Sequence, residues 1–189
     1  MKRETVSRIF RNQPTIETER LILRQMSLVD AEDMYAYAKD PEVTQYLTWE
    51  PHTSLSYTRE YLEYLESRYA IGDFFDWAVI EKISGRMVGT CGFTCFRYED
   101  DCGEIGYVLN PDVWGRGYAP EALRALFSFG FDTLLLERIE AKFMEGNVRS
   151  LRVMEKLGMR FEGYHRNGMR IKGKLSTVGV CAILRGEHF

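Results

Sequence analysis

Residues 110–123 are the most informative part of the chain and read Asn110-Pro111-Asp112-Val113-Trp114-Gly115-Arg116-Gly117-Tyr118-Ala119-Pro120-Glu121-Ala122-Leu123. It joins a strand-like segment to a helix-like segment through a turn that carries Gly115 and Gly117. Glycine lets the backbone bend sharply and lets a ligand approach closely. Pro120 stands early in the expected helix, where its missing N–H costs little. The helix start offers unpaired N–H groups and a positive dipole end, which predicts an anion site suited to a pyrophosphate, with Arg116 adding charge beside it.

Taken alone, a glycine turn before a helix also fits a tight connection that binds nothing. Two other phosphate-binding motifs are excluded by the residues themselves. A P-loop requires Gly-Lys-Ser/Thr after four spacer residues, and the dinucleotide fingerprint requires a third glycine within a βαβ unit. Neither is found in this stretch. Whether this turn binds an anion or only connects two elements must therefore be judged from the rest of the sequence.

The segments around the turn alternate between strand-like and helix-like patterns. The expected strands are residues 20–26, 75–82, 87–96, 103–110, 138–144, 160–172 and 175–184, and the expected helices are 28–39, 55–70, 117–133 and 147–158. This order predicts a mixed α/β (α+β) fold with a central β-sheet of about seven strands, antiparallel in its front half, and about four helices. Residues 1–15 are expected to form an N-terminal extension and residues 16–189 a single domain. Cys91 and Cys95, four apart in one expected strand, should face the same side.

Composition narrows the class of protein. The chain has 189 residues, of which 45% are hydrophobic and 28% charged, as in soluble globular domains. No apolar run approaches the ~20 residues of a membrane span, and the basic N-terminus has no apolar segment typical of a secretory signal, so we expect a cytoplasmic protein without membrane contact. A net charge of −3 argues against nucleic acid as a direct partner. The spacing of the four cysteines fits no zinc pattern, so no metal site is expected.

In this context the turn resembles motif A of the GNAT acetyltransferases, Gln/Arg-x-x-Gly-x-Gly/Ala. Gly117 and Ala119 match the last two fixed positions, while Trp114 stands where Gln or Arg is usual. The form Trp-Gly-Arg-Gly-Tyr-Ala, followed by Glu-Ala-Leu, is similar to the RimJ/RimL-type branch, which acetylates the N-termini of ribosomal proteins. The resemblance runs from Thr18 to about Leu184. It includes Gly-Glu-Ile-Gly-Tyr at 103–107, Asn-Val-Arg-Ser at 147–150 and Glu-Lys-Leu-Gly-Met at 155–159.

The resemblance implies acetyl-CoA as co-substrate and a binding site built mostly from backbone. In such enzymes the amides of the turn hold the CoA pyrophosphate. The strand before the turn carries a β-bulge that splays it from its neighbour, which exposes backbone groups to the pantetheine and the thioester carbonyl. Asn147 is implied as a polar contact to the cofactor arm, and it equally fits a helix N-cap. The implied cofactor-binding residues are Tyr107, Val108, Leu109, Trp114, Gly115, Arg116, Gly117, Tyr118, Ala119, Asn147 and Ser150.

Two residues are implied as catalytic. Many GNAT enzymes protonate the leaving thiolate with a tyrosine at the position of Met154, which cannot do so, whereas RimL-like members are thought to use a serine where Ser150 stands. Ser150 is therefore the candidate general acid, with a serine that caps the first helical turn as the alternative. Glu104 is the candidate general base, because histone-type members have a glutamate in a similar Glu-Ile-x-aromatic context. The alternatives for Glu104 are a solvated strand glutamate or a structural ion pair.

The expected function is direct acetyl transfer to a primary amine, best fitted by the N-terminal α-amine of a protein or peptide. At pH 7.4 roughly a third of an α-amine is neutral, against about one in a thousand for lysine, so an α-amine needs less help from a base. One alternative acceptor is a small amine such as a polyamine, an aminoglycoside or an amino-acid analogue. A non-catalytic acyl-CoA-binding module is the alternative from another class. Monomer or homodimer, and acyl donors longer than acetyl, stay open.

Overall fold

The structure is a computed structural model in which residues 1–188 are described. It contains one eight-stranded sheet in the order β1-β2-β3-β4-β5-β6-β8-β7. Every pair of neighbouring strands is antiparallel except β5 and β6, which are parallel. The strands are β1 (Ile16–Glu17), β2 (Leu21–Arg24), β3 (Asp76–Glu81), β4 (Met87–Arg97), β5 (Cys102–Leu109), β6 (Arg138–Met144), β7 (Arg160–Ile171) and β8 (Lys174–Leu184). The mixed α/β fold is confirmed, with eight strands in place of about seven.

Six α-helices are present in the described chain, where about four were expected. They are α1 (Arg3–Arg11), α2 (Ala31–Ala38), α3 (Pro41–Thr44), α4 (Leu55–Ile71), α5 (Tyr118–Ser128) and α6 (Val148–Lys156). The two helices that were not predicted are α1 and α3. The single turn of α3 begins where α2 ends, because the Asp40 side chain accepts a hydrogen bond from the N–H of Glu42 and Pro41 fits the first helical position.

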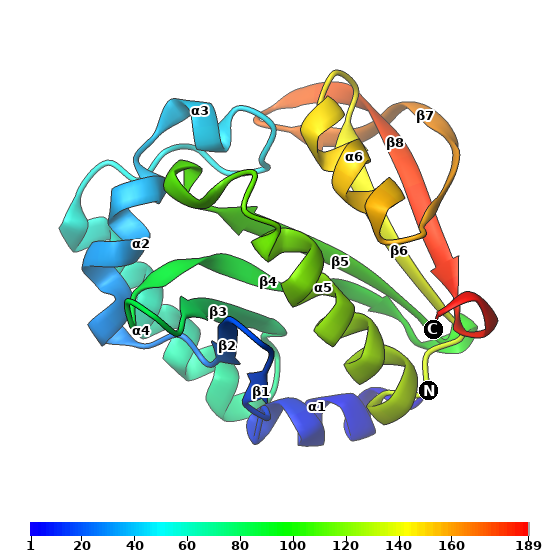
Figure 1. Ribbon diagram of the computed structural model, residues 1–189, viewed down its shortest axis with the longest axis horizontal. Helices are drawn as coiled ribbons and strands as arrows, with labels where there is room; N and C mark the ends of the chain where they lie inside the picture. The colour runs from blue at the N-terminus through cyan, green and yellow to red at the C-terminus, as the bar shows by residue number, and fades with distance from the viewer. Residues whose placement is uncertain (189) are drawn as a thin grey trace.

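Side-chain alternation along β3 divides the apolar core into two layers. Trp77 and Val79 pack into a core that also holds residues of α1, α5 and α6. Ala78 and Ile80 point the other way, into a core shared with α2 and α4. This is the period of two that a strand buried on both faces imposes. The sheet therefore lies between two helical layers, and α5 crosses in front of β4 and β5 (Figure 1).

Helix α1 brings the expected N-terminal extension into the first of these cores. Val6 and Phe10, four residues apart on one helical face, are fully buried. The Phe10 ring lies 4.8 Å from that of Phe75 and 5.4 Å from that of Trp77. Trp77 in turn donates its indole N–H to the carbonyl of Pro14 at 2.8 Å. Residues 1–15 thus share one core with the sheet.

The prediction that Cys91 and Cys95 face the same side was wrong. Cys91 is buried and Cys95 is exposed. The register between β4 and β5 shifts between Phe93 and Cys95, so that Thr94 is an extra residue on β4. One extra residue reverses the alternation of every side chain beyond it.

Strand β7 forms one edge of the sheet and is exposed along most of its length. Its register with β8 shifts twice, between Phe161 and Gly163 and between His165 and Met169. Its exposed cations are Arg160, Arg166 and Arg170. The edge is therefore both irregular and positively charged.

An ion-pair network spans the parallel junction of the sheet. Glu140 on β6 is 7% exposed and accepts hydrogen bonds from both Nη atoms of Arg97 on β4, each at 2.9 Å, and from Nε of Arg138 at 2.7 Å. Arg138 also pairs with Glu162 on β7. The Arg97 guanidinium, together with that of Arg138, lowers the pKa of Glu140 to about 2. The network thus links strands on both sides of β5.

Replacement of Phe10 by alanine is expected to reduce the free energy of unfolding by about 3–5 kcal/mol, because it removes a fully buried aromatic side chain. Urea unfolding monitored by circular dichroism measures the loss. Arg8→Ala, on the exposed face of the same helix, is the matched control and should change stability by less than about 0.5 kcal/mol. A loss below about 1 kcal/mol for Phe10→Ala would mean that α1 is not part of the folded domain.

Glu140→Gln is expected to destabilise the protein by about 1–3 kcal/mol near pH 7, because two arginines lose a charged acceptor. The folded-state pKa of Glu140 lies below its ordinary value of 4.5, so its contribution is complete above that pH and is lost as the pH falls toward 2. Urea unfolding of both proteins at pH 7, 5, 4 and 3 should show the difference shrinking with acid. A difference that stays constant down to pH 3 would contradict this role.

Candidate active site

The parallel strands β5 and β6 separate shortly after they begin. They pair only from Cys102 to Ile105 and from Arg138 to Ala141. Beyond these residues β5 remains paired with β4 as far as Leu109, and β6 remains paired with β8. The later part of β5 therefore has backbone groups on its β6 side without a strand partner among residues 1–188.

The irregularity expected in β5 lies opposite it, in β4. The extra residue Thr94 faces Glu104 and Ile105, the level at which β5 and β6 part. Its hydroxyl donates to the carbonyl of Glu104 at 3.3 Å. A bulge strengthens the local twist of a strand pair, so a bulge at this level favours the divergence of β5 from β6.

The predicted turn has the shape that its glycines suggested. Gly115 has φ 78° and Gly117, the N-cap of α5, has φ 81°, both in the left-handed region. Trp114 N–H donates to the carbonyl of Pro111 and Arg116 N–H to that of Val113, so these two amides, expected to face a ligand, are occupied. Within residues 1–188 the N–H groups of Gly115, Gly117, Tyr118 and Ala119 meet no acceptor. Four of the six predicted amides thus remain for an anion.

The side chains of the turn fasten it to the strands around it. Trp114 donates its indole N–H to the carbonyl of Leu109 at 2.8 Å, and the Arg149 guanidinium lies 4.6 Å above its ring. Tyr118 donates its hydroxyl to Glu81 at 2.6 Å. The Arg116 guanidinium lies 3.9 Å from the same carboxylate and is more than half exposed. Trp114, at the position where Gln or Arg was expected, therefore connects β5 with α6.

Helix α6 lies over β6, on the far side of the strand separation from α5 (Figure 1). Asn147 is its N-cap and accepts the N–H of Ser150 at 3.1 Å, which confirms the capping alternative. Ser150 also accepts a hydrogen bond from the hydroxyl of Tyr107 on β5, with 3.3 Å between the oxygens. Met154, one turn on, is 2% exposed and belongs to the core. The separated parts of the fold thus meet through Tyr107 and Ser150.

Glu104 lies on the opposite face of β5 from Tyr107 and is 9% exposed. Its carboxylate pairs with the ammonium of Lys142 at 2.6 Å and accepts a weaker bond from Thr94 at 3.3 Å. Lys142 follows Ala141, the last residue of β6 that pairs with β5. The structural ion pair that the sequence left open is therefore present. The two candidate catalytic residues, Glu104 and Ser150, lie on opposite faces at the strand separation.

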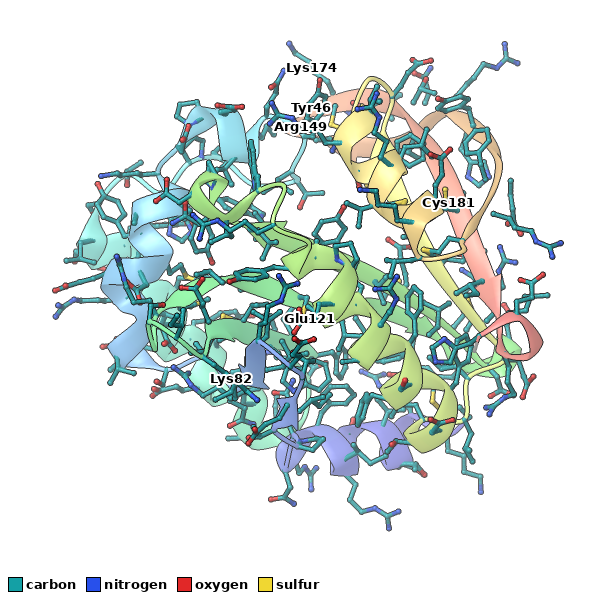
Figure 2. The ribbon with its side chains drawn as sticks, in the orientation of Figure 1. Tyr46, Lys82, Glu121, Arg149, Lys174 and Cys181 are labelled. Carbon is teal, nitrogen blue, oxygen red and sulfur yellow. The ribbon has the colours of Figure 1, made fainter. Side chains whose placement is uncertain are left out.

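Sequence reasoning missed Lys142. It also missed the contacts that join the segment after α2 to α6 and to the β7–β8 turn. Lys172, in the β7–β8 turn, donates to the carbonyl of Thr44 at 2.8 Å, and Arg149 pairs with Glu42 at 3.1 Å. Tyr46 and Arg149, labelled in Figure 2, both lie at this junction, where the Tyr46 hydroxyl is 3.8 Å from the place of a Cβ added at Gly146. These partners lie more than a hundred residues apart in the chain, so no local pattern could have indicated them. They bring the segment after α2 to the end of the site.

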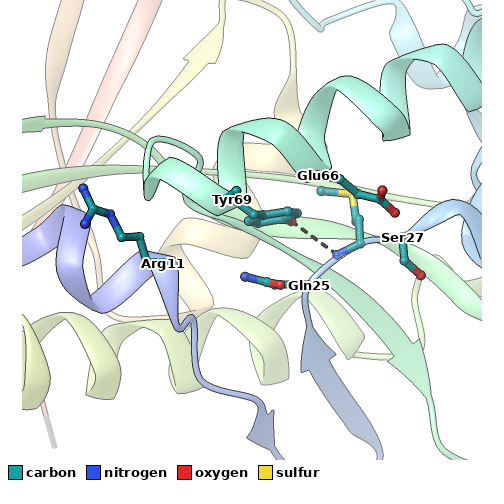
Figure 3. Close-up of a pocket in the computed structure, with 7 residues that line it drawn as sticks. Arg11, Gln25, Ser27, Glu66 and Tyr69 are labelled. Carbon is teal, nitrogen blue, oxygen red and sulfur yellow. Dashed lines mark hydrogen bonds between the residues drawn. The ribbon is translucent and has the colours of Figure 1, made fainter.

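A hollow on the surface lies apart from the residues described above. It has a volume of about 390 Å³ between α1, the end of β2 and α4, as Figure 3 shows. Tyr69 forms its wall and accepts the N–H of Met26 at 3.3 Å. None of the predicted site residues lines it, so we assign it no role in the reaction.

No helix in the described part of the chain is both long and apolar enough to cross a membrane. Among residues 1–188, no group of three or more His, Cys, Asp and Glu side chains is arranged to hold a metal ion.

Comparison with known proteins matches residues 20–160 to the family model for the acetyltransferase (GNAT) domain. The N-acetyltransferase p20 of Bacillus licheniformis is 37% identical over 174 residues, which are 92% of this chain and 98% of that protein. A GNAT-family acetyltransferase from Bacillus anthracis is 32% identical, with a TM-score of 0.80 over 92% of this chain and all of the other. The ribosomal α-N-protein acetyltransferase RimL, solved in complex with coenzyme A, has the same fold at 20% identity, with a TM-score of 0.76 over 90% and 98%.

Gly117→Ala is expected to weaken the binding of coenzyme A about tenfold or more, because alanine is strained at the left-handed φ of 81° and would displace the free amides of the turn. Gly85→Ala is the matched control, since Gly85 also has a left-handed φ of 68° and open space around its added Cβ. Both variants should lose about 1–2 kcal/mol of stability from backbone strain. Isothermal titration calorimetry with coenzyme A distinguishes them, and equal affinities would exclude the turn as the binding site.

Proposed function

Because this chain is an acetyltransferase of the GNAT family, as the match over residues 20–160 establishes, we propose that it transfers acetyl from acetyl-CoA to the N-terminal α-amine of a protein or peptide. The observation that carries the choice of acceptor is the ion pair between Glu104 and Lys142.

The proposed place of acetyl-CoA follows from the unpaired backbone groups. The pyrophosphate would bind the free amides of Gly115, Gly117, Tyr118 and Ala119, at the positive end of the α5 dipole. Arg116, more than half exposed beside them, adds a charge that can move toward the anion. The fit is supported by the open space around Gly115, where an added Cβ would meet nothing within 4 Å.

The pantetheine arm would continue along the part of β5 that β6 leaves free. Tyr107 and Val108 are half-buried there, and Leu109 lies at the start of the turn. Their backbone groups can form the hydrogen bonds that a neighbouring strand would otherwise take. A donor in this row would stabilise the negative charge that develops on the thioester oxygen.

The acceptor would approach from the face of the sheet that carries Glu104. Its carboxylate already has the Lys142 ammonium within 2.6 Å, so an incoming ammonium must compete with a fixed partner. An amine that is already partly neutral avoids that competition. Roughly a third of an α-amine is neutral at pH 7.4, against about one in a thousand for a lysine side chain. The ion pair therefore favours the α-amine.

The proposed chemistry divides between the two faces of the sheet. The neutral nitrogen attacks the thioester carbonyl carbon, a C–N bond forms, and the C–S bond breaks with its electron pair on sulfur. The proton that the nitrogen loses passes to Glu104 or, through it, to water. Ser150, on the opposite face, lies on the side where the thiolate leaves. Holding both reactants at the strand separation supplies much of the rate enhancement.

We expect purified protein to release free thiol from acetyl-CoA fastest with peptides that begin with Ala, Ser or Thr. Lysine peptides with blocked termini should react at least about a hundredfold more slowly at pH 7.4, in line with their smaller neutral fraction. Mass spectrometry of the products locates the acetyl group. Faster reaction with polyamines, aminoglycosides or amino-acid analogues would mean that the acceptor is a small amine and not the α-amine of a protein or peptide. Saturable acetyl-CoA binding with no thiol release for any acceptor would favour a binding module.

A further inference from the structure

The hydrogen bond between Tyr107 and Ser150 joins β5 to α6 across the separated strands. Tyr107 lies two residues beyond Ile105, where the pairing of β5 with β6 ends, and its side chain projects from the same face of β5 as that of Ile105. Ser150 stands in the first turn of α6, and its backbone N–H is fixed by the Asn147 cap. Both ends of the bond are therefore held by regular structure.

The hydroxyl of Ser150 has one proton and two lone pairs. One lone pair accepts the proton of Tyr107, and within residues 1–188 the serine hydroxyl donates to no acceptor. The Tyr107 hydroxyl likewise forms no other hydrogen bond with the described residues. A phenol is a stronger acid than an aliphatic alcohol, so Tyr107 is the better donor of the two. The arrangement leaves the Ser150 proton free to point elsewhere.

We propose that Tyr107 is a positioning residue for the acetyl transfer reaction, whose hydroxyl fixes the rotamer of Ser150 so that the serine proton is directed at the departing thiolate of coenzyme A. This rests on the proposed function. A hydroxyl that accepts one hydrogen bond becomes a stronger donor of another. Tyr107 therefore acts on the sulfur through Ser150.

The proton balance defines the role of Ser150 more closely than the sequence did. A serine hydroxyl is a far weaker acid than a thiol, whose pKa is about 8.5, so full transfer of the serine proton to sulfur is unfavourable. Ser150 instead donates a hydrogen bond to the sulfur as it receives the electron pair of the C–S bond. The proton that ends on the thiol comes from water after release. Ser150 and Tyr107 each keep their own proton throughout.

Burial supports a permanent donor at Tyr107. It raises the pKa of the phenol to about 12, against an ordinary value of 10, so Tyr107 stays protonated at every pH at which an α-amine is acetylated. No ionisation of Tyr107 should enter the rate profile below about pH 10.

The test is a double-mutant cycle on thiol release with the best acceptor peptide. Ser150→Ala should reduce kcat about 10- to 100-fold, as loss of a donor to a developing charge does, and Tyr107→Phe about 3- to 10-fold. Neither should change the KM for acetyl-CoA more than about twofold. In the Ser150→Ala background, Tyr107→Phe should cost less than about twofold further, because its only route to the sulfur is gone. Tyr164→Phe, an exposed tyrosine on β7, is the matched control and should leave kcat unchanged.

The cycle separates a positioning role from a merely structural one. Equal losses from Tyr107→Phe in both backgrounds, or a loss that appears only in KM, would overturn the proposal. If the wild-type enzyme is active and Tyr107→Phe has the same kcat, the positioning role of Tyr107 is wrong and the proposed function stands. Wild-type protein that binds acetyl-CoA but releases no thiol with any amine would overturn the proposed function as well. Matching thermal denaturation curves confirm that the variants are folded.

Discussion

The separation of β5 from β6 determines where the other parts of the candidate site lie. Unpaired backbone groups inside a protein are unfavourable, so the groups that face the gap need water or a ligand as a partner, and each strand needs a neighbour on its other edge to hold it in place. Here β4 holds β5 to its end and β8 holds β6 to its end. The antiparallel strands on either side therefore make the gap possible. The turn at 114–119 follows β5 and the start of α6 follows β6, so both lie where the two strands diverge.

Local chemistry predicted the parts of the site that one short segment determines. Gly115 and Gly117 carry left-handed backbone, as the sharp turn predicted from their spacing requires, and Asn147 caps α6. These features depend on residues within a few positions of one another. The same is true of most strands and helices, whose periodicity is visible in single segments.

The remaining features depend on contacts between distant segments. Lys142 reaches Glu104 across 38 residues, and Tyr107 reaches Ser150 across 43. The bulge at Thr94 is a property of the β4–β5 register and has no sequence signal of its own. Helix α1 was missed because only a few apolar side chains, including Val6 and Phe10, stand among charged residues, and its amphipathic face is meaningful only once the Phe75 and Trp77 side chains are in place.

Strand β7 ends the sheet with a long exposed row of peptide groups, which in other proteins invites chains to stack edge to edge. Its two register shifts bend that row out of line, and the exposed Arg166 and Arg170 place like charges along it, while Arg160 pairs with Glu187. A second copy arriving edge-on would meet both a mismatched hydrogen-bond ladder and repulsion. The irregular hairpin thus lacks the flat, regular ladder on which such stacking depends, while the opposite edge of the described sheet is limited to the two residues of β1.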